Sequence, residues 1–296
     1  MDSKVIGVLH PGAMGAPVGA CMQENGHTVL WASAGRSGES RDRAVRAGLI
    51  EVDSVAELVR RSDIVMSICP PHAAIDVARS AAGARMFVDA NAVSPATAAA
   101  VAEVVASTGG SFVDGGIIGP PPVEAGTTRF YLSGAGSVEV ARLFEGSALD
   151  ARSLAGASSA PRASALKMCY AAWTKGTDAL LMGILAAASS LGAHDDLIAE
   201  WELSQPALLD RLVGSAWATE TKGWRFVGEM EEIASTFESI GLPGGFHLAA
   251  AETFGRVPHN PDAPQARETL DRVVAALAAT GSDPGSAEGG GRPPLT

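Results

Sequence analysis

The first half of the sequence is constrained most by a regular alternation of short apolar runs with longer helix-like segments. The apolar runs carry β-branched, Leu or aromatic residues and are bounded by turn-forming residues, as is typical of strands. The expected strands are Lys4–Leu9, Thr28–Trp31, Ile64–Ile68, Met86–Asp89, Ser111–Asp114 and Arg129–Ser133. The expected helices are Ala13–Asn25, Arg41–Ala47, Ser54–Arg61, Ala73–Ala82 and Ser94–Ser107. This alternation predicts an α/β fold built on a doubly wound parallel sheet.

The second half contains no convincing strand and several segments of helical pattern. Residues Ala163–Gly192 contain no proline and predict one long helix. We predict a Rossmann domain over residues 1–160, an all-α C-terminal domain for substrate binding and dimerisation over residues 161–280, and a disordered tail over residues 281–296. The other expected helices are Leu197–Glu202, Pro206–Ala218, Gly228–Ile240, Gly245–Phe254 and Pro264–Ala279.

Composition excludes several functional classes. The formal net charge is −11, and an acidic chain does not offer the basic surface that general nucleic-acid binding requires. Cys21, Cys69 and Cys169 are far apart, so they predict neither a disulfide framework nor a metal site. The uncharged stretch Ala179–Ala193 is too short to cross a membrane, and the N-terminus does not resemble a signal peptide. We expect a cytoplasmic protein with no membrane partner.

A glycine-rich loop, His10-Pro11-Gly12-Ala13-Met14-Gly15, joins the first expected strand to the first expected helix. In the fingerprint G-x-G-x-x-G, the glycines permit a tight turn and a close backbone approach to a pyrophosphate at the helix N-terminus. Gly12 and Gly15 occupy the second and third glycine positions, whereas His10 replaces the first. Pro11 can compensate, because it fixes its own φ and favours an extended His10. The predicted cofactor contacts here are His10, Pro11, Gly12, Ala13, Met14 and Gly15.

The second strand is followed by residues that favour NADP over NAD. An acidic residue at this strand end would bind the ribose hydroxyls of NAD, and none is present there. Ser33, Arg36 and Ser37 can instead hold a 2′-phosphate, with Arg36 making a bidentate pair. We predict NADP (NADPH) as the cofactor and these three residues as its contacts.

Several motifs in order along the chain resemble the 6-phosphogluconate and β-hydroxyacid dehydrogenases, to which the imine reductases are also similar. The resemblance extends to about residue 280 and marks a divergent branch. It implies that Cys69, Pro70 and Asn91 lie at the cofactor, that Asn91 takes part in catalysis, and that Lys167 is the catalytic lysine. The segments that carry it are Ile6–Pro17, Cys69-Pro70-Pro71, Asp89–Pro95 and Ser164-Ala165-Leu166-Lys167.

The departures from the family pattern concern the substrate. Ala171 stands where an asparagine follows the catalytic lysine, and Ile118 stands where a serine would bind a carboxylate. Glu231-Glu232 replace a Lys-Asp pair of a later helix. Together with Glu229, these glutamates are interpreted as a solvated helix face, and they would favour a cationic substrate if they faced the cleft.

The candidate proton donors lie on the long helix. Lys167 is expected in its first turns, where burial and nearby cations would lower its pKa into a usable range. Tyr170, three residues later, is the alternative donor. Lys175 and His247 are further candidates whose reach to the active site is left open.

These observations leave three hypotheses. The first is an NADP-dependent oxidoreductase acting on a small hydroxy or carbonyl substrate, with Lys167 as acid/base. The second is an imine reductase, favoured by Ile118 and Ala171 in place of carboxylate-binding groups. The third is a non-catalytic protein that senses dinucleotides. The long helix is apolar toward its end, and in the resembling families it builds a dimer, so we expect a homodimer.

Overall fold

The computed structural model describes residues 3–155 and 161–279. The chain divides into two compact units, one of residues 1–173 and 231–245 and the other of residues 174–230 and 246–296. The expected domain boundary at residue 160 and the expected disordered tail at 281–296 lie outside the described residues. The boundary therefore stays a prediction.

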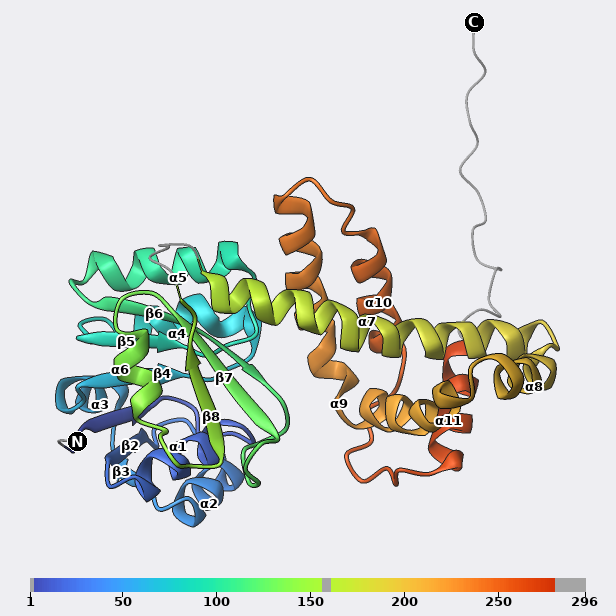
Figure 1. Ribbon diagram of the computed structural model, residues 1–296. Helices are drawn as coiled ribbons and strands as arrows, with labels where there is room; N and C mark the ends of the chain where they lie inside the picture. The colour runs from blue at the N-terminus through green and yellow to red at the C-terminus, as the bar shows by residue number, and fades with distance from the viewer. Residues whose placement is uncertain (1–2, 156–160, 280–296) are drawn as a thin grey trace, which may run out of the picture. The chain divides into compact units, whose positions relative to one another are not determined.

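The first unit is built on one sheet with the strand order β3-β2-β1-β4-β5-β6-β7-β8 (Figure 1). All six expected strands are present. The two additional strands are β3 and β8, and β3 is only three residues long. The strands are β1 Val5–Val8, β2 Thr28–Ala32, β3 Ile50–Val52, β4 Ile64–Ser67, β5 Met86–Asp89, β6 Ser111–Ile118, β7 Thr128–Ser133 and β8 Leu149–Ser153.

One strand pair departs from the parallel sheet that the sequence predicts. β6 and β7 run antiparallel, with Asp114 opposite Ser133 and Ile118 opposite Arg129. The reason is the length of their connection, residues 119–127, because a parallel crossover needs a dozen or more residues and usually a helix. The remaining strand pairs, including β7 with β8, are parallel.

Helices cover both faces of the sheet, so the doubly wound architecture is confirmed. One hydrophobic cluster joins the sheet to α1, α2 and α6, and a second joins it to α3, α4 and α5. Within β2, Val29 and Trp31 enter the first cluster while Leu30 and Ala32 enter the second, as the alternation of side chains along a strand requires. The helices are α1 Gly15–Glu24, α2 Gly38–Arg46, α3 Val55–Arg61, α4 Ala74–Ser80, α5 Pro95–Ser107 and α6 Ser137–Arg142.

The rest of the described chain is helical, beginning with the long α7. The sequence predicted two helices over Pro206–Ala218 and Gly228–Ile240, and this division is wrong because α9 is continuous. Gly223 lies against Phe254, and packing of this kind keeps a helix intact across a residue of low helix propensity. The helices are α7 Arg162–Ser190, α8 His194–Ser204, α9 Pro206–Ser239, α10 Gly245–Gly255 and α11 Arg267–Ala279.

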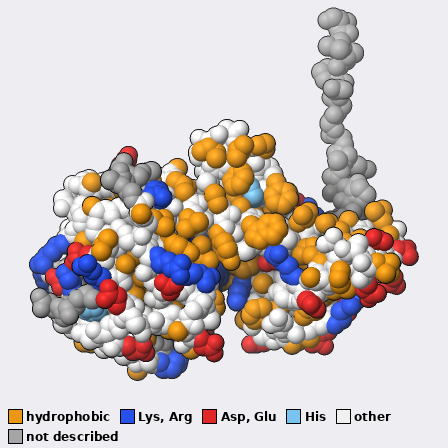
Figure 2. Space-filling view, viewed as in Figure 1, with side chains coloured by type: hydrophobic (Ala, Val, Ile, Leu, Met, Phe, Trp, Pro, Cys, Tyr) orange, Lys and Arg blue, Asp and Glu red, His pale blue; other side chains and the backbone are white. Residues whose placement is uncertain are grey.

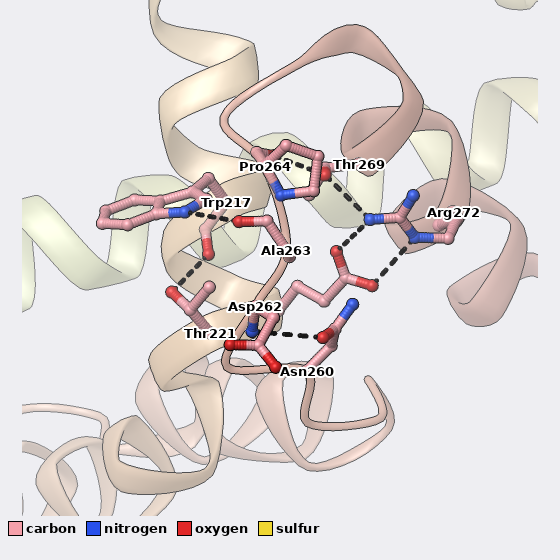
Figure 3. Close-up of polar contacts among 9 residues, drawn as sticks. Trp217, Thr221, Asn260, Asp262, Ala263, Pro264, Thr269 and Arg272 are labelled. Carbon is pink, nitrogen blue, oxygen red and sulfur yellow. Dashed lines mark hydrogen bonds and ion pairs between the residues drawn. The ribbon is translucent and has the colours of Figure 1, made fainter.

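In the second unit, polar contacts tie the α10–α11 connection to α9 (Figure 3). The Trp217 indole N–H donates to the Ala263 carbonyl at 3.0 Å. The Arg272 guanidinium donates to both oxygens of Glu220, which is 7% exposed.

None of the helices described in residues 3–155 and 161–279 has the length and apolar character that a membrane crossing requires.

Candidate functional site

The glycine loop forms the tight turn that the sequence predicts. The Gly12 N–H donates to the His10 carbonyl at 2.8 Å, and α1 then begins at Gly15. A Cβ on Gly15 would lie 2.1 Å from the His10 carbonyl oxygen, so only glycine fits there. A Cβ on Gly12 would meet no protein atom within 4 Å. Gly15 therefore permits the tight turn, whereas the space beside Gly12 is open to a ligand.

His10 and Arg36 place two buried polar atoms near this loop. The His10 Nδ1 and the Arg36 Nε have no hydrogen-bond partner among the described residues. Burial, with a further contribution from the Arg36 charge, lowers the pKa of His10 to about 4. His10 is therefore neutral at physiological pH, and a bound dinucleotide with its phosphate and ribose oxygens is the kind of ligand that satisfies such atoms.

The end of β2 brings Ser33 and Arg36 together in one turn. The Arg36 N–H donates to the Ser33 carbonyl at 3.1 Å, and Gly35 supplies the positive φ of 71°. Ser37 is used differently, since its hydroxyl caps α2 by accepting from the Ser40 N–H. Glu51 on β3 is a residue of this region that the sequence did not reveal, because β3 was not expected. Glu51 accepts two hydrogen bonds from Arg41, and hydrogen bonds from Ser33 and Arg41 lower its pKa.

Asn91 connects the ends of β4 and β5. Its side-chain oxygen accepts from the Cys69 N–H at 2.6 Å, and its amide nitrogen donates to the Ser67 hydroxyl at 3.1 Å. Asn91 is 3% exposed. Burial raises the pKa of the Cys69 thiol to about 11, so this thiol stays protonated. The structure thus brings Cys69 and Asn91 together as a rigid edge at the carboxyl ends of the strands.

Asp89, at the end of β5, is a candidate that sequence reasoning left out. It is 1% exposed, and its Oδ1 accepts from the Asn91 N–H at 2.9 Å. Its Oδ2 has no hydrogen-bond partner among the described residues. Burial is the largest cause that raises the pKa of Asp89 to about 7, and the charges of Asp114 and Glu232 add to it. The available signal was an aspartate at the end of each of two consecutive expected strands, Met86–Asp89 and Ser111–Asp114.

The start of α7 is anchored by Asp114 on β6. The Asp114 Oδ2 accepts from the Ala163 N–H at 2.7 Å and the Ser164 N–H at 3.1 Å, and its Oδ1 accepts from the Ser164 hydroxyl at 2.5 Å. Ser133 on β7 donates to the same carboxylate at 2.7 Å. A carboxylate at a helix N-terminus satisfies unpaired N–H groups and favours the helix dipole.

Lys167 is held close to β6 by this anchor. A Cβ on Gly116 would lie 2.8 Å from the Ala163 carbonyl oxygen and 3.0 Å from the Lys167 Cβ, so α7 packs directly on the strand backbone. Lys167 is only partly exposed. Tyr170, one turn later, is 45% exposed. The first turns of α7 therefore fix the backbone of Lys167 beside β6, the strand whose Asp114 is paired with Asp89 of β5.

Lys175 and His247 belong to the second compact unit. Lys175 forms an ion pair with Glu229 in which the two side chains are 13% and 12% exposed, and its ammonium lies 4.8 Å from the centre of the Phe226 ring. His247 is 5% exposed, and burial lowers its pKa. Lys175 thus has a buried partner within its own unit.

The interpretation of Glu229, Glu231 and Glu232 as a solvated face is wrong for two of the three. Glu229 is paired with Lys175, and Glu232 accepts from the Ser94 N–H at 2.6 Å and the Thr97 hydroxyl at 2.9 Å. Glu232 thus caps α5 from a distant helix, while Glu231 is exposed. The different surroundings of the three glutamates follow from helix geometry, because successive residues point in different directions around the axis.

In the described residues, no group of three or more His, Cys, Asp or Glu could hold a metal ion.

The fold and these contacts define a dinucleotide-binding class. The glycine loop lies between β1 and α1, and β1 and β4 are neighbours at the point where the strand order reverses, which is where doubly wound sheets bind ligands. Residues 5–143 match the NAD binding domain of 6-phosphogluconate dehydrogenase, and residues 188–257 match a domain of unknown function (DUF1932).

Several solved structures share this fold. A conserved hypothetical protein from Sinorhizobium meliloti 1021 is 27% identical, with a TM-score of 0.67 over 94% of this chain and 97% of that chain. A 3-hydroxyisobutyrate dehydrogenase of Mycobacterium tuberculosis is 19% identical, with a TM-score of 0.60 over 94% and 99%. An imine reductase from Myxococcus stipitatus in complex with NADP+ is 18% identical, with a TM-score of 0.55 over 85% and 93%.

A curated relative, the cytokine-like nuclear factor N-PAC of Xenopus tropicalis, is 31% identical over 125 residues. The match covers 39% of this chain and 23% of that relative, so the chain corresponds to about a quarter of the relative's length. The resemblance to the 6-phosphogluconate dehydrogenase-like superfamily is confirmed. The matched domain over residues 5–143 is an NAD binding domain, and the fold is shared with a solved structure described as similar to 3-hydroxyacid dehydrogenases.

Proposed function

We propose that the chain is an NADP-dependent oxidoreductase that transfers a hydride between the nicotinamide and a small hydroxy or carbonyl substrate, with Lys167 as acid/base. The observation that carries this proposal is the placement of Lys167. Asp114 fixes the start of α7, and Gly116 lets the helix pack against β6, so the lysine backbone has one defined position. Rigid positioning of a proton donor is what general acid/base catalysis requires.

The described residues fit a dinucleotide. The space beside Gly12 admits a pyrophosphate, and Arg36 with Ser33 offers donors for a 2′-phosphate. When bound, the nicotinamide supplies or accepts the hydride. Asn91 and Cys69 would keep the strand ends in place beneath it. Ser37 contributes less directly, since its hydroxyl already caps α2.

The test separates cofactor binding from turnover. Lys167→Met should leave the NADPH dissociation constant within about twofold of wild type and lower turnover by at least about 100-fold, the usual contribution of a general acid/base. Arg36→Ala should weaken NADPH binding by about tenfold or more and leave NADH binding nearly unchanged. Unchanged turnover in Lys167→Met would remove this lysine from the mechanism, and equal losses for both cofactors in Arg36→Ala would contradict the NADP preference.

A second candidate is an imine reductase that reduces a C=N substrate with NADPH. It is favoured by Ile118, which ends β6 as a side chain 4% exposed, and by the buried Ala171. Both are apolar where a carboxylate-binding serine and an asparagine are expected from the resemblance. NADPH oxidation against a panel of 2-keto acids, aldehydes, ketones and cyclic imines distinguishes the two, because only a carboxylate-binding site prefers the keto acids.

The match to a protein named as a nuclear factor keeps a non-catalytic, dinucleotide-sensing role as a further alternative. Such a protein would bind NADPH with normal affinity yet show no turnover with any member of the panel. Lys167→Met would then change neither binding nor any measured rate. Turnover that depends on Lys167 would exclude this alternative.

We also propose a homodimer. Leu166, Tyr170 and Trp173 are 37%, 45% and 67% exposed, and their spacing places them along one face of α7. Hydrophobic side chains gather along α7 on the face shown in Figure 2. Light scattering should therefore give about twice the 30.1 kDa mass of the chain. A mass near 30.1 kDa at micromolar concentration would contradict the dimer.

A further inference from the structure

Asp114 and Glu232 both interact electrostatically with Asp89, at the carboxyl end of β5. Asp114 on β6 accepts four hydrogen bonds, from the Ala163 and Ser164 N–H groups and from the Ser133 and Ser164 hydroxyls. Glu232 on α9 accepts two, from the Ser94 N–H and the Thr97 hydroxyl. The hydrogen-bonding capacity of both carboxyl groups is therefore largely used by donors at the starts of α7 and α5.

Asp89 receives much less support. Its hydrogen bonds come from one residue, Asn91, whose N–H donates to Oδ1 and whose side chain adds a further contribution, while its Oδ2 is buried without a hydrogen-bond partner among the described residues. An ionised carboxylate in this position loses its hydration with little compensation, and its interactions with Asp114 and Glu232 are unfavourable. Of the three acids, Asp89 is therefore the one whose geometry favours the protonated form near neutral pH.

Asp89 is also linked to the candidate cofactor edge. Asp89 accepts a hydrogen bond from the Asn91 N–H. The Asn91 side chain in turn connects Cys69 and Ser67. The groups that interact with it electrostatically are Asp114 from β6, Glu232 from α9 and the Cys69 thiol after β4. The thiol has a raised pKa of about 11, so it is uncharged at neutral pH.

We propose that Asp89 is a proton-dependent positioning residue for the cofactor edge. When protonated, it leaves the carboxylates that cap α5 and α7 undisturbed, and Asn91 stays hydrogen-bonded to Cys69 and Ser67. When ionised, it repels Asp114 and Glu232, loosens this edge and places a negative charge near an anionic cofactor. Affinity for NADPH therefore falls as the pH rises through neutrality. The affinity part of this inference rests on the proposed cofactor binding.

The first experiment measures the NADPH dissociation constant by fluorescence between pH 5.5 and 8.5. In wild type it should rise by at least about threefold through pH 7, whereas in Asp89→Asn it should stay within about twofold of the low-pH wild-type value. Glu103→Gln removes an exposed carboxylate of α5 and should keep the wild-type pH dependence. A flat wild-type profile, or the same step in Asp89→Asn, would overturn the inference.

A second measurement needs neither turnover nor cofactor. In wild-type protein with ¹³C-labelled aspartate, one carboxyl resonance should titrate near pH 7, and it should be absent in Asp89→Asn. If that variant does not fold, the wild-type titration still decides, because the lack of any aspartate titrating above about pH 6 contradicts a neutral Asp89. If wild type binds no NADPH but shows this titration, the proposed function fails while the protonation of Asp89 stands.

Discussion

The Asp114 carboxylate of β6 accepts the Ser164 hydroxyl of α7 at 2.5 Å, although the two residues are 50 positions apart in the sequence. The same carboxylate accepts the Ala163 and Ser164 N–H groups. Asp114 thus acts as the N-terminal cap of α7, and the helix turn that follows carries Lys167.

Removing this cap should destabilise the protein. Asp114→Ala leaves buried N–H and hydroxyl donors without their charged acceptor, so the free energy of unfolding should fall by about 3 kcal/mol or more. Ser133→Ala removes one donor to Asp114 and an acceptor of the Arg162 and Ala163 N–H groups, while the charged acceptor stays in place, so it should cost less, about 1–2 kcal/mol. Urea denaturation of both variants checks the difference, and equal losses would mean that Asp114 does not dominate the anchor.

The two loop glycines should respond differently to substitution. Gly12→Ala places a methyl group where no protein atom lies within 4 Å, so the melting temperature should stay unchanged while NADPH affinity falls by about tenfold or more. Gly15→Ala places it 2.1 Å from the His10 carbonyl oxygen and should lower both stability and affinity. Gly228→Ala, another open position, serves as the control and should lower neither. Normal NADPH binding by Gly12→Ala would argue against this loop as the pyrophosphate site.

The Lys175–Glu229 pair should contribute to stability through burial. Because its side chains are only 13% and 12% exposed, Lys175→Met alone should cost about 3 kcal/mol or more, by leaving Glu229 buried without its cation. The double variant Lys175→Met/Glu229→Gln should recover much of this loss. The exposed Arg267–Asp271 pair, at 62% and 63%, should couple by less than about 0.5 kcal/mol. Double-mutant cycles measure both pairs, and similar coupling energies would contradict the role of burial.

His10 should make the free energy of unfolding depend on pH in the acidic range. Its pKa in the folded protein is lowered from 6.5 to about 4, so the unfolded chain binds the proton more readily. The contribution of neutral His10 is complete above pH 6.5 and is lost as the pH falls toward 4, by up to about 3 kcal/mol. His10→Gln cannot be protonated, so the stability difference between it and wild type should change across this window. A constant difference from pH 7 to pH 4 would show that His10 keeps its ordinary pKa.

Local sequence determined most of the secondary structure of the first half, with the short β3 as an exception, and it determined the cofactor loop. The six expected strands are all present, and the expected helix that begins near Ser54 is capped by the Ser54 hydroxyl, which accepts from the Glu57 N–H. Gly12 and Gly15 lie at the β1–α1 turn as expected. These features depend on residues within a few positions of one another, so their pattern is readable along the chain.

Only the tertiary structure decided which hydrogen-bond donors each buried carboxylate contacts. Asp114 reaches Ser164 across 50 residues, and Glu232 reaches Ser94 across 138 residues. No local spacing reports such contacts, so the sequence analysis assigned Glu232 to a solvated face and omitted Asp89. The continuity of α9 and the antiparallel β6–β7 pair were also decided by packing and by connection length. Periodicity and turn residues act over a few positions, so the sequence alone specifies the helices and strands. Burial and long-range hydrogen bonds arise only after those elements pack, so the tertiary structure determines the environment of each side chain at the strand ends.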